Sequence, residues 1–235
     1  MDAFLFVALP YVALVLAIGV GIYRYVTNSY TYSSLSSQIL ENRKLFWGSV
    51  PWHYGITLIL LVHLFAALLP GVAAWLLGGE TRRFVLELTG MALGLYTLFG
   101  LVVLIVRRLV PKSLAQATTS YMDGVLLFVL FVQVASGVGI AIFNRWGGLW
   151  YLQTAVPWFW SLATLHPDMS TVASLPALVK VHFVTGFLIV LLFPFSRLVH
   201  LIMFPIHYLW RPHQVVIWNR QPGRRAGDYP RRTAG

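Results

Sequence analysis

Four of the seven histidines lie within long apolar stretches of the chain, two in each of two stretches. His53 and His63 belong to one stretch, and His182 and His200 to the other. Ionisable side chains at membrane depth are rare and are by default candidates for function. A single histidine of this kind is more often a neutral imidazole that hydrogen bonds a neighbouring helix, but two pairs on two helices favour ligation of a cofactor.

The spacing within each pair places one histidine towards either side of a membrane. Ten residues separate His53 from His63, a helical rise of about 15 Å, and eighteen separate His182 from His200, about 27 Å and five full turns on one face. A haem between two helices takes one imidazole from each, as cofactor sites in helix bundles do. We therefore predict two b-type haems with bis-histidine ligation, one near each side.

Ligation by two histidines favours electron transfer, because the iron then has no open position for oxygen or substrate. A di-metal zinc or copper site is the rival use of the histidines, but ligands so far apart along their helices cannot converge on one ion. The chain has no cysteine, which excludes disulfides, cysteine-ligated clusters and a C-x-x-C-H haem attachment within it.

The elements that position these histidines are predicted to be membrane-spanning helices. The chain is 58% hydrophobic and 10% charged, whereas soluble domains are roughly 45–50% apolar and about 25% charged. A crossing needs about 20 apolar helical residues. Five stretches qualify, at about 4–26, 50–77, 84–106, 123–144 and 178–205. The predicted fold is an all-α integral membrane protein, a bundle of five transmembrane helices over 1–205 with a basic tail at 206–235.

The basic residues predict the orientation of the bundle. Lys and Arg number 17 against 7 Asp and Glu, a net charge of +10. Twelve of the basic residues lie in the segments 24–49 and 107–122 and in the tail, against four in the alternate connections. By the positive-inside rule, the C-terminus is cytoplasmic and the N-terminus external. The same pattern, with contact to membrane lipid, explains the charge without nucleic-acid binding.

This orientation predicts how the histidines pair. The second span runs outward and the fifth inward, so His53 pairs with His200 at the inner haem and His63 with His182 at the outer haem. The unequal spacings leave a rotation of about 80° from facing, which requires oblique axial bonds, with Pro194 a source of local bending. Arg197, one turn before His200, is a candidate partner for a propionate of the inner haem; its alternative role is to snorkel to the interface.

Four segments of the chain resemble the gamma subunit of respiratory nitrate reductase, a membrane cytochrome b. The resemblance covers nearly the whole chain, and the last segment is the most specific because histidine, FPFSRL and histidine recur together in it at this spacing. The segments are YSSLSSQILE at 32–41, WGSVPWHYG with LLVHLF at 47–65, RRLVPKSLAQATT at 107–119, and VHFVTGFLIVLLFPFSRLVHLIMFPIHYLWRP at 181–212.

The resemblance implies a quinol-oxidising subunit in the cytoplasmic (inner) membrane of a bacterium or archaeon, with two haem b groups held by the four histidines in the pairing above. Its cytoplasmic face is expected to dock an iron–sulfur (beta) subunit, which passes electrons to a molybdenum-containing (alpha) subunit that reduces nitrate. The family usually has a lysine at the outer start of the third helix, near the quinol. Here the closest match is Arg82, so Arg82 and Arg83 are the candidates for the quinol site.

Two alternatives stay open from the sequence. One is a related cytochrome b of a sulfite or heterodisulfide reductase-like complex, which only the associated subunits distinguish. The other is a small proton-coupled transporter whose membrane histidines relay protons, since such residues also mark proton paths.

Overall fold

In the computed structural model, the chain is described over residues 2–28, 43–109, 120–144 and 147–202. These residues belong to one compact unit, Met1–Met203. They form helices and turns, with no strand among them. The basic tail predicted at 206–235 lies outside the described residues.

Among the described residues, five helices are long and apolar enough to span a membrane, which confirms the predicted number of spans. The first combines a π-helical turn, η1 (Phe4–Ala8), with α1 (Leu9–Thr27). The others are α2 (Arg43–Leu68), α4 (Glu80–Leu109), α6 (Tyr121–Phe143) and α10 (Ala177–Leu192). The protein is therefore a multi-pass, all-α membrane protein.

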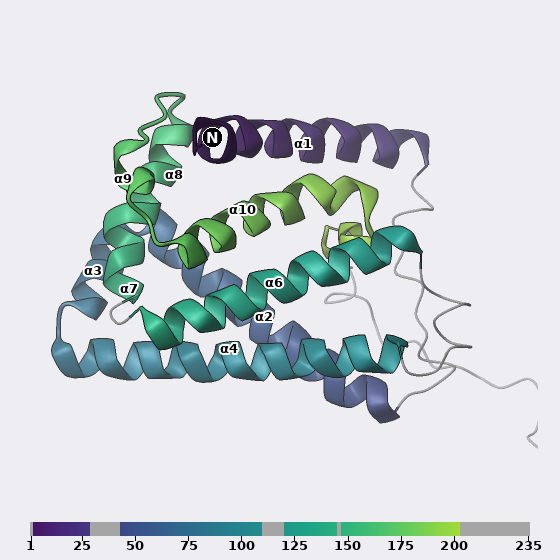
Figure 1. Ribbon diagram of the computed structural model, residues 1–235, viewed down its shortest axis with the longest axis horizontal. Coiled ribbons are helices and arrows are strands. Elements are labelled where there is room, and N and C mark those ends of the chain that lie inside the picture. Colours follow the sequence, from purple (N-terminus) through teal and green to yellow (C-terminus); the bar gives the residue numbers. More distant parts are fainter. Residues whose placement is uncertain (1, 29–42, 110–119, 145–146, 203–235) are drawn as a thin grey trace, which may run out of the picture. The chain divides into compact units, whose positions relative to one another are not determined.

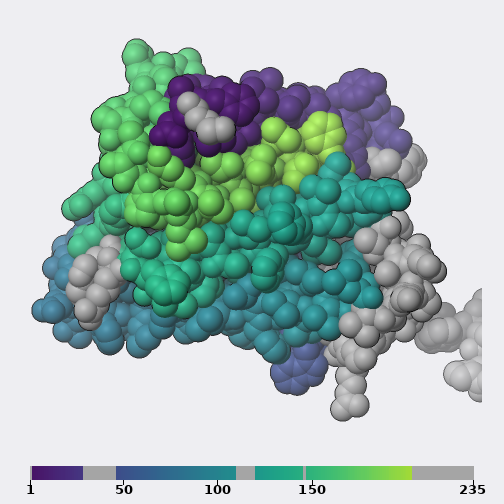
Figure 2. Space-filling model, in the orientation of Figure 1, coloured from purple at the N-terminus to yellow at the C-terminus, as the bar shows by residue number. Residues whose placement is uncertain are grey.

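Successive long helices run in opposite directions, so α1 begins at one end of the bundle and the chain after α10 reaches the other end (Figure 1). The packing order is α1 against α10, α10 against α6, α6 against α4, and α4 against α2. Figure 2 shows the order α1, α10, α6 and α4 across one face. Many large apolar side chains on these helices are exposed, as expected of surfaces that contact lipid.

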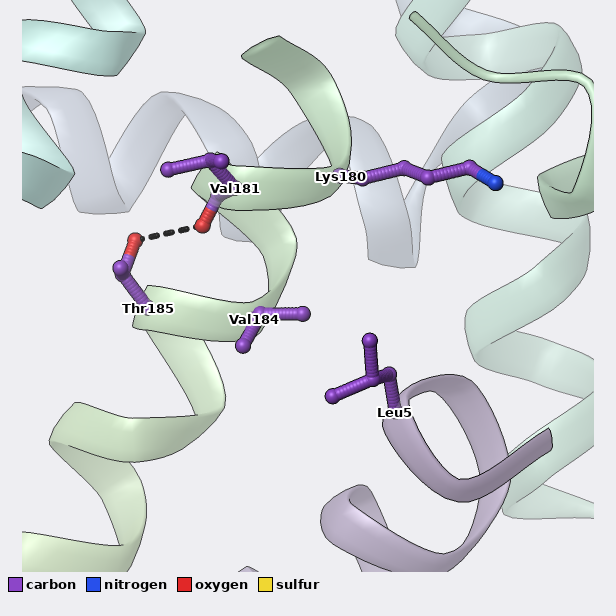
Figure 3. A pocket seen from close by; sticks show the side chains of 5 residues that line it. All are labelled: Leu5, Lys180, Val181, Val184 and Thr185. Atoms are coloured by element: carbon purple, nitrogen blue, oxygen red, sulfur yellow. Dashed lines mark hydrogen bonds between the residues drawn. The ribbon is translucent and has the colours of Figure 1, made fainter. Parts of the chain in front are cut away.

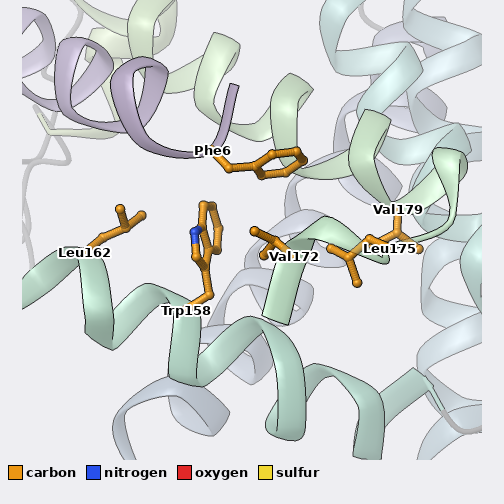
Figure 4. Packing of buried hydrophobic residues seen from close by; sticks show 6 residues of the cluster. All are labelled: Phe6, Trp158, Leu162, Val172, Leu175 and Val179. Carbon is orange, nitrogen blue, oxygen red and sulfur yellow. The ribbon is translucent and has the colours of Figure 1, made fainter. Parts of the chain in front are cut away.

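The segment between α6 and α10 forms short helices that cover one end of the bundle. They are α7 (Gly147–Trp150), η3 (Tyr151–Ala155), α8 (Val156–Ala163) and α9 (Ser170–Ala173). The fully buried rings of Phe6 and Trp158 meet edge to face, 5.9 Å between centres, in an apolar cluster that joins η1, α8, α9 and α10 (Figure 4). This cluster holds the short helices against the N-terminal end of α1.

The predicted span 50–77 is wrong in its continuity. The helix α2 ends at Leu68, Leu69 has φ −125° and ψ 58°, and a separate helix, α3 (Pro70–Leu77), begins at Pro70. A proline has no N–H for the preceding helix and disfavours helical conformation in the residue before it, but it suits the first turn of a new helix. Pro70 therefore ends one helix and starts the next.

The prediction that His182 and His200 lie on one face of a continuous helix is also wrong. The helix α10 ends at Leu192, a 3₁₀ turn η4 (Phe193–Phe195) follows, and Ser196 is extended before a second 3₁₀ helix, η5 (Arg197–Leu201). Pro194 lies inside this break, where its missing N–H cannot continue the α-helical bonds. The sequence predicts local bending at Pro194, and the structure has a full interruption of the helix there.

Candidate functional site

The structure brings together two of the four membrane histidines from elements far apart in the sequence. The ring centres of His53 on α2 and His200 on η5 are 6.4 Å apart, with an angle of 70° between the ring planes. With metal–nitrogen bonds of roughly 2 Å, two imidazoles on opposite sides of one iron have ring centres about 6 Å apart. These two residues therefore fit a bis-histidine haem.

Three of the histidines have Nδ1 within hydrogen-bond distance of a backbone carbonyl in their own helix. His53 Nδ1 lies 2.8 Å from Ser49 O, and His63 Nδ1 lies 2.8 Å from Ile59 O. His200 Nδ1 lies 2.6 Å from Arg197 O. When Nδ1 donates to the carbonyl, Nε2 carries the lone pair that binds a metal, which is the usual arrangement of metal-ligating histidines.

His182 is oriented by the neighbouring helix α6 instead. Its Nδ1 lies 3.0 Å from Gln133 O and 3.1 Å from Ser136 Oγ. Its Nε2 lies 3.2 Å from the Gln133 amide nitrogen, and the Gln133 amide oxygen accepts a hydrogen bond from Thr185. Ligation of a metal by Nε2 requires this amide to turn away from the ring.

His63 lies against the short helices that cover this end of the bundle. Its ring meets that of Tyr151 at 5.1 Å between centres and 75° between planes. Among the described residues, no ring contact joins His63 to His182. The proposed outer pair is thus less closely assembled than the inner pair.

Tyr151 was not predicted from the sequence, because it lies in the long connection between spans. Its hydroxyl donates to His63 O at 3.1 Å. Burial raises the pKa of Tyr151 to about 12, so the phenol stays protonated at neutral pH. Tyr151 therefore contacts His63 with both its ring and its hydroxyl.

Gln133 and Ser136 were also missed, although the sequence carries a signal for them. They are polar residues three apart in an otherwise apolar span, and residues at that spacing share a helix face. That face points to α10, where it meets His182 and Thr185.

Arg197, predicted to bind a haem propionate, pairs in the structure with a buried carboxylate. Its Nε lies 3.3 Å from Asp123 Oδ1, and Arg108 approaches the other oxygen of Asp123 at 3.0 Å. Arg197 is thus placed at the inner pair, beside His200. The propionate contact stays a prediction.

Arg82, predicted to lie in the quinol site, has a structural role at the end of α3. Its guanidinium donates to Trp75 O at 3.0 Å and to Leu76 O at 3.3 Å, and it lies 4.9 Å from the centre of the Trp75 ring. A cation is favourable at a helix C-terminus, where carbonyls lack partners. Arg82 therefore stabilises the end of α3, and its role in the quinol site stays a prediction. Arg83 follows it, half-buried, on the first turn of α4.

An open pocket of about 310 Å³ lies between η1 and α10 (Figure 3). Apolar side chains line most of it, together with Lys180 and Thr185. Lys180 donates to Asp2 Oδ2 at 2.9 Å, and this contact holds the pKa of the Asp2 carboxyl below its usual value. This ion pair joins Asp2, which precedes η1, to α10.

The helices and the histidines define a class, a multi-pass membrane protein with histidine side chains at membrane depth in two of its spans. Within that class, the family model for the nitrate reductase gamma subunit matches residues 2–219. The chain belongs to the nitrate reductase gamma subunit family.

Three similar proteins support membership of this family. The chain is 35% identical over 210 residues to the nitrate reductase gamma chain of Bacillus subtilis, covering 88% of this chain and 94% of that protein. It is 33% identical over 222 residues to the respiratory nitrate reductase 1 gamma chain of Escherichia coli, covering 92% and 97%. A nitrate reductase-like protein NarX of Mycobacterium tuberculosis is 30% identical over 219 residues, which are 91% of this chain and 33% of that protein. The chain is therefore a membrane subunit of a nitrate reductase complex.

Proposed function

We propose that this chain is the di-haem cytochrome b subunit of a respiratory nitrate reductase, which oxidises quinol and passes electrons inward across the cytoplasmic membrane. The observation that carries the proposal is the facing pair His53 and His200, with ring centres 6.4 Å apart. Family membership supports the same reading.

The chain's own residues would bind and orient the haems. His53 and His200 would hold the inner haem, and His63 and His182 the outer one. With Nδ1 of each imidazole donating to a carbonyl, Nε2 would be the ligating atom, and at His182 this requires the Gln133 amide to turn away. Bound haem supplies a one-electron carrier at each site.

The quinol would bind on the outer side, next to His63 and His182. Oxidation of a quinol releases two electrons and two protons, and an external site delivers the protons outside while the electrons move inward. Arg82 and Arg83 are the candidates to hold the quinol oxygen. Tyr151, whose hydroxyl stays protonated and lies beside His63, adds a polar group to this region.

The acceptors would be the iron–sulfur (beta) and molybdenum-containing (alpha) subunits, docked on the cytoplasmic side. The C-terminal segment from His207 carries six arginines together with Trp210, Trp218 and Tyr229. Arginine and aromatic residues are enriched at protein interfaces. The segment is therefore our candidate for the docking surface, with anionic membrane lipid as its alternative partner.

The test is a reduced-minus-oxidised optical spectrum of the purified complex, followed by reduction with a quinol. We expect two low-spin b haems per gamma chain, both reducible by quinol under anaerobic conditions. A colourless chain after expression with haem available would contradict the proposal and favour the transporter alternative. Co-purification with sulfite or heterodisulfide reductase-like subunits would instead favour the other cytochrome b.

A further inference from the structure

The position of His200 does not follow from the helix α10 that precedes it. Ser196, with φ −114° and ψ −180°, separates α10 and η4 from η5. The five residues of η5 form a short 3₁₀ helix with few backbone bonds of its own. Side-chain contacts to neighbouring helices must therefore hold His200 opposite His53.

One of these contacts comes from Asp123, at the start of α6. Its side chain is buried, with the residue only 5% exposed. Oδ1 forms an ion pair with Arg197 Nε at 3.3 Å, while Oδ2 accepts from Arg108 at 3.0 Å and from the Ser120 backbone N–H at 3.0 Å. One carboxylate thus joins the last turn of α4, the N-terminus of α6 and η5.

Arg197 links Asp123 to His200. Its side chain pairs with Asp123, while its backbone carbonyl lies 2.6 Å from His200 Nδ1. Val199, the next residue but one, is fully buried and limits rotation of the segment. A shift of Arg197 therefore moves the carbonyl that orients the His200 ring.

We propose that Asp123 is a positioning residue for the inner haem site, which holds His200 towards His53 through Arg197. This inference rests on the proposed function, because it assigns Asp123 a role toward the haem of that pair. Residues that orient a metal ligand in this way typically change metal affinity by about 10–100-fold when they are replaced.

The informative substitution is Asp123→Asn in the complete complex. Asparagine keeps the size of the side chain and an oxygen that accepts the Ser120 N–H, but it loses the charge that pairs with Arg197 and Arg108. The matched control is Ser120→Ala, which removes the hydrogen bond from the Asp123 N–H to Ser120 Oγ and leaves the carboxylate in place.

The readouts are the electron paramagnetic resonance signals of the two low-spin haems, their midpoint potentials and the haem content. His53→Ala and His63→Ala variants assign the two signals. In Asp123→Asn, we expect roughly tenfold weaker retention of the inner haem and a shifted or broadened signal for any that is retained. The outer signal and the Ser120→Ala complex should match the wild type.

Two results would overturn the inference while the proposed function stands. One is an Asp123→Asn complex with both haem signals unchanged. The other is loss of both signals together, which would make Asp123 a general stabiliser of the bundle. A wild-type complex without haem would instead overturn the proposed function itself.

Discussion

At the scale of single residues, the four histidines differ in what orients them. The rings of His53, His63 and His200 each have Nδ1 next to a carbonyl within their own helix, and this carbonyl sets the orientation of the ring. The ring of His182 is oriented by Gln133 and Ser136 of another helix. The outer site therefore depends more than the inner site on how α6 and α10 pack.

A glycine on α6 gives this dependence a direct test. A Cβ atom at Gly137 would lie 2.9 Å from His182 Cε1, whereas one at Gly124, on the same helix, would have no atom within 4 Å. We predict that Gly137→Ala displaces the His182 ring and weakens the outer haem, measured by the spectrum of the purified complex. Gly124→Ala should leave both haems intact. Equal haem content in the two variants would show that the α6–α10 packing does not position His182.

The candidate quinol residue Arg82 is also tested by substitution. We predict that Arg82→Ala retains both haems but slows their reduction by quinol by roughly tenfold or more, since hydrogen bonds to charged groups contribute about 1.5–3 kcal/mol. A chemical reductant such as dithionite should still reduce both haems at the wild-type rate.

The conservative variant separates this role from the capping of α3. Arg82→Lys keeps the cation, but it cannot reproduce the guanidinium bonds to Trp75 O and Leu76 O. We expect Arg82→Lys to retain most of the quinol activity. Wild-type quinol kinetics in Arg82→Ala would move the site away from Arg82, towards His63 or Tyr151.

At the scale of elements, the packing of α2 against α4 places the candidate ligand His53. Gly48, Gly55 and Gly100 are all buried where these helices meet. A Cβ atom at Gly100 would lie 2.5 Å from Trp52 N, next to His53. Small residues at helix interfaces let backbones approach in this way in membranes.

We predict that Gly100→Ala forces α2 and α4 apart and destabilises the protein by roughly 1–3 kcal/mol, as overpacking usually does. Gly90→Ala, on the same helix with no atom within 4 Å of the added Cβ, is the matched control. Thermal unfolding in detergent measures the effect. A midpoint for Gly100→Ala equal to that of the control would mean that the α2–α4 contact adapts without loss.

The elements also show what the sequence could and could not predict. Length and apolar character predicted five spans, because the lipid interior requires them. By the same criterion, α2 and α3 were predicted as one span across Pro70, and α10 was predicted to continue past Pro194. Hydropathy does not show where a helix is interrupted. The orientation of the spans predicted that His53 pairs with His200, and the structure brings these two rings together. The sequence did not predict the break through which His200 reaches His53, nor the contacts of Asp123, Gln133 and Tyr151, which depend on tertiary packing.

At the scale of the whole molecule, the proposed direction of electron flow depends on the orientation in the membrane. The start of α1 and the end of α10 lie at opposite ends of the bundle, which is consistent with an odd number of spans (Figure 1). The excess of basic residues in the segments 24–49, 107–122 and 206–235 predicts that the end near Thr27 is cytoplasmic.

Because the chain has no cysteine, single introduced cysteines test this orientation without background. Ser174→Cys lies at the end of α9, and Tyr121→Cys replaces a residue that is 99% exposed at the start of α6, at the opposite end of the bundle. We predict that a membrane-impermeant maleimide labels Ser174→Cys in spheroplasts with an intact cytoplasmic membrane. Tyr121→Cys should be labelled only after this membrane is permeabilised. The reverse pattern would invert the proposed topology.

The pairing of the histidines is tested most directly by four single variants, His53→Ala, His63→Ala, His182→Ala and His200→Ala, each purified in the complete complex. Each variant should lose or weaken one haem, because one iron loses half of its axial ligands while the other keeps both. Low-temperature optical and electron paramagnetic resonance spectra distinguish the two haems. We predict that His53 and His200 variants share one spectral lesion, and that His63 and His182 variants share the other. Loss of the same haem in the His53 and His182 variants would contradict the account.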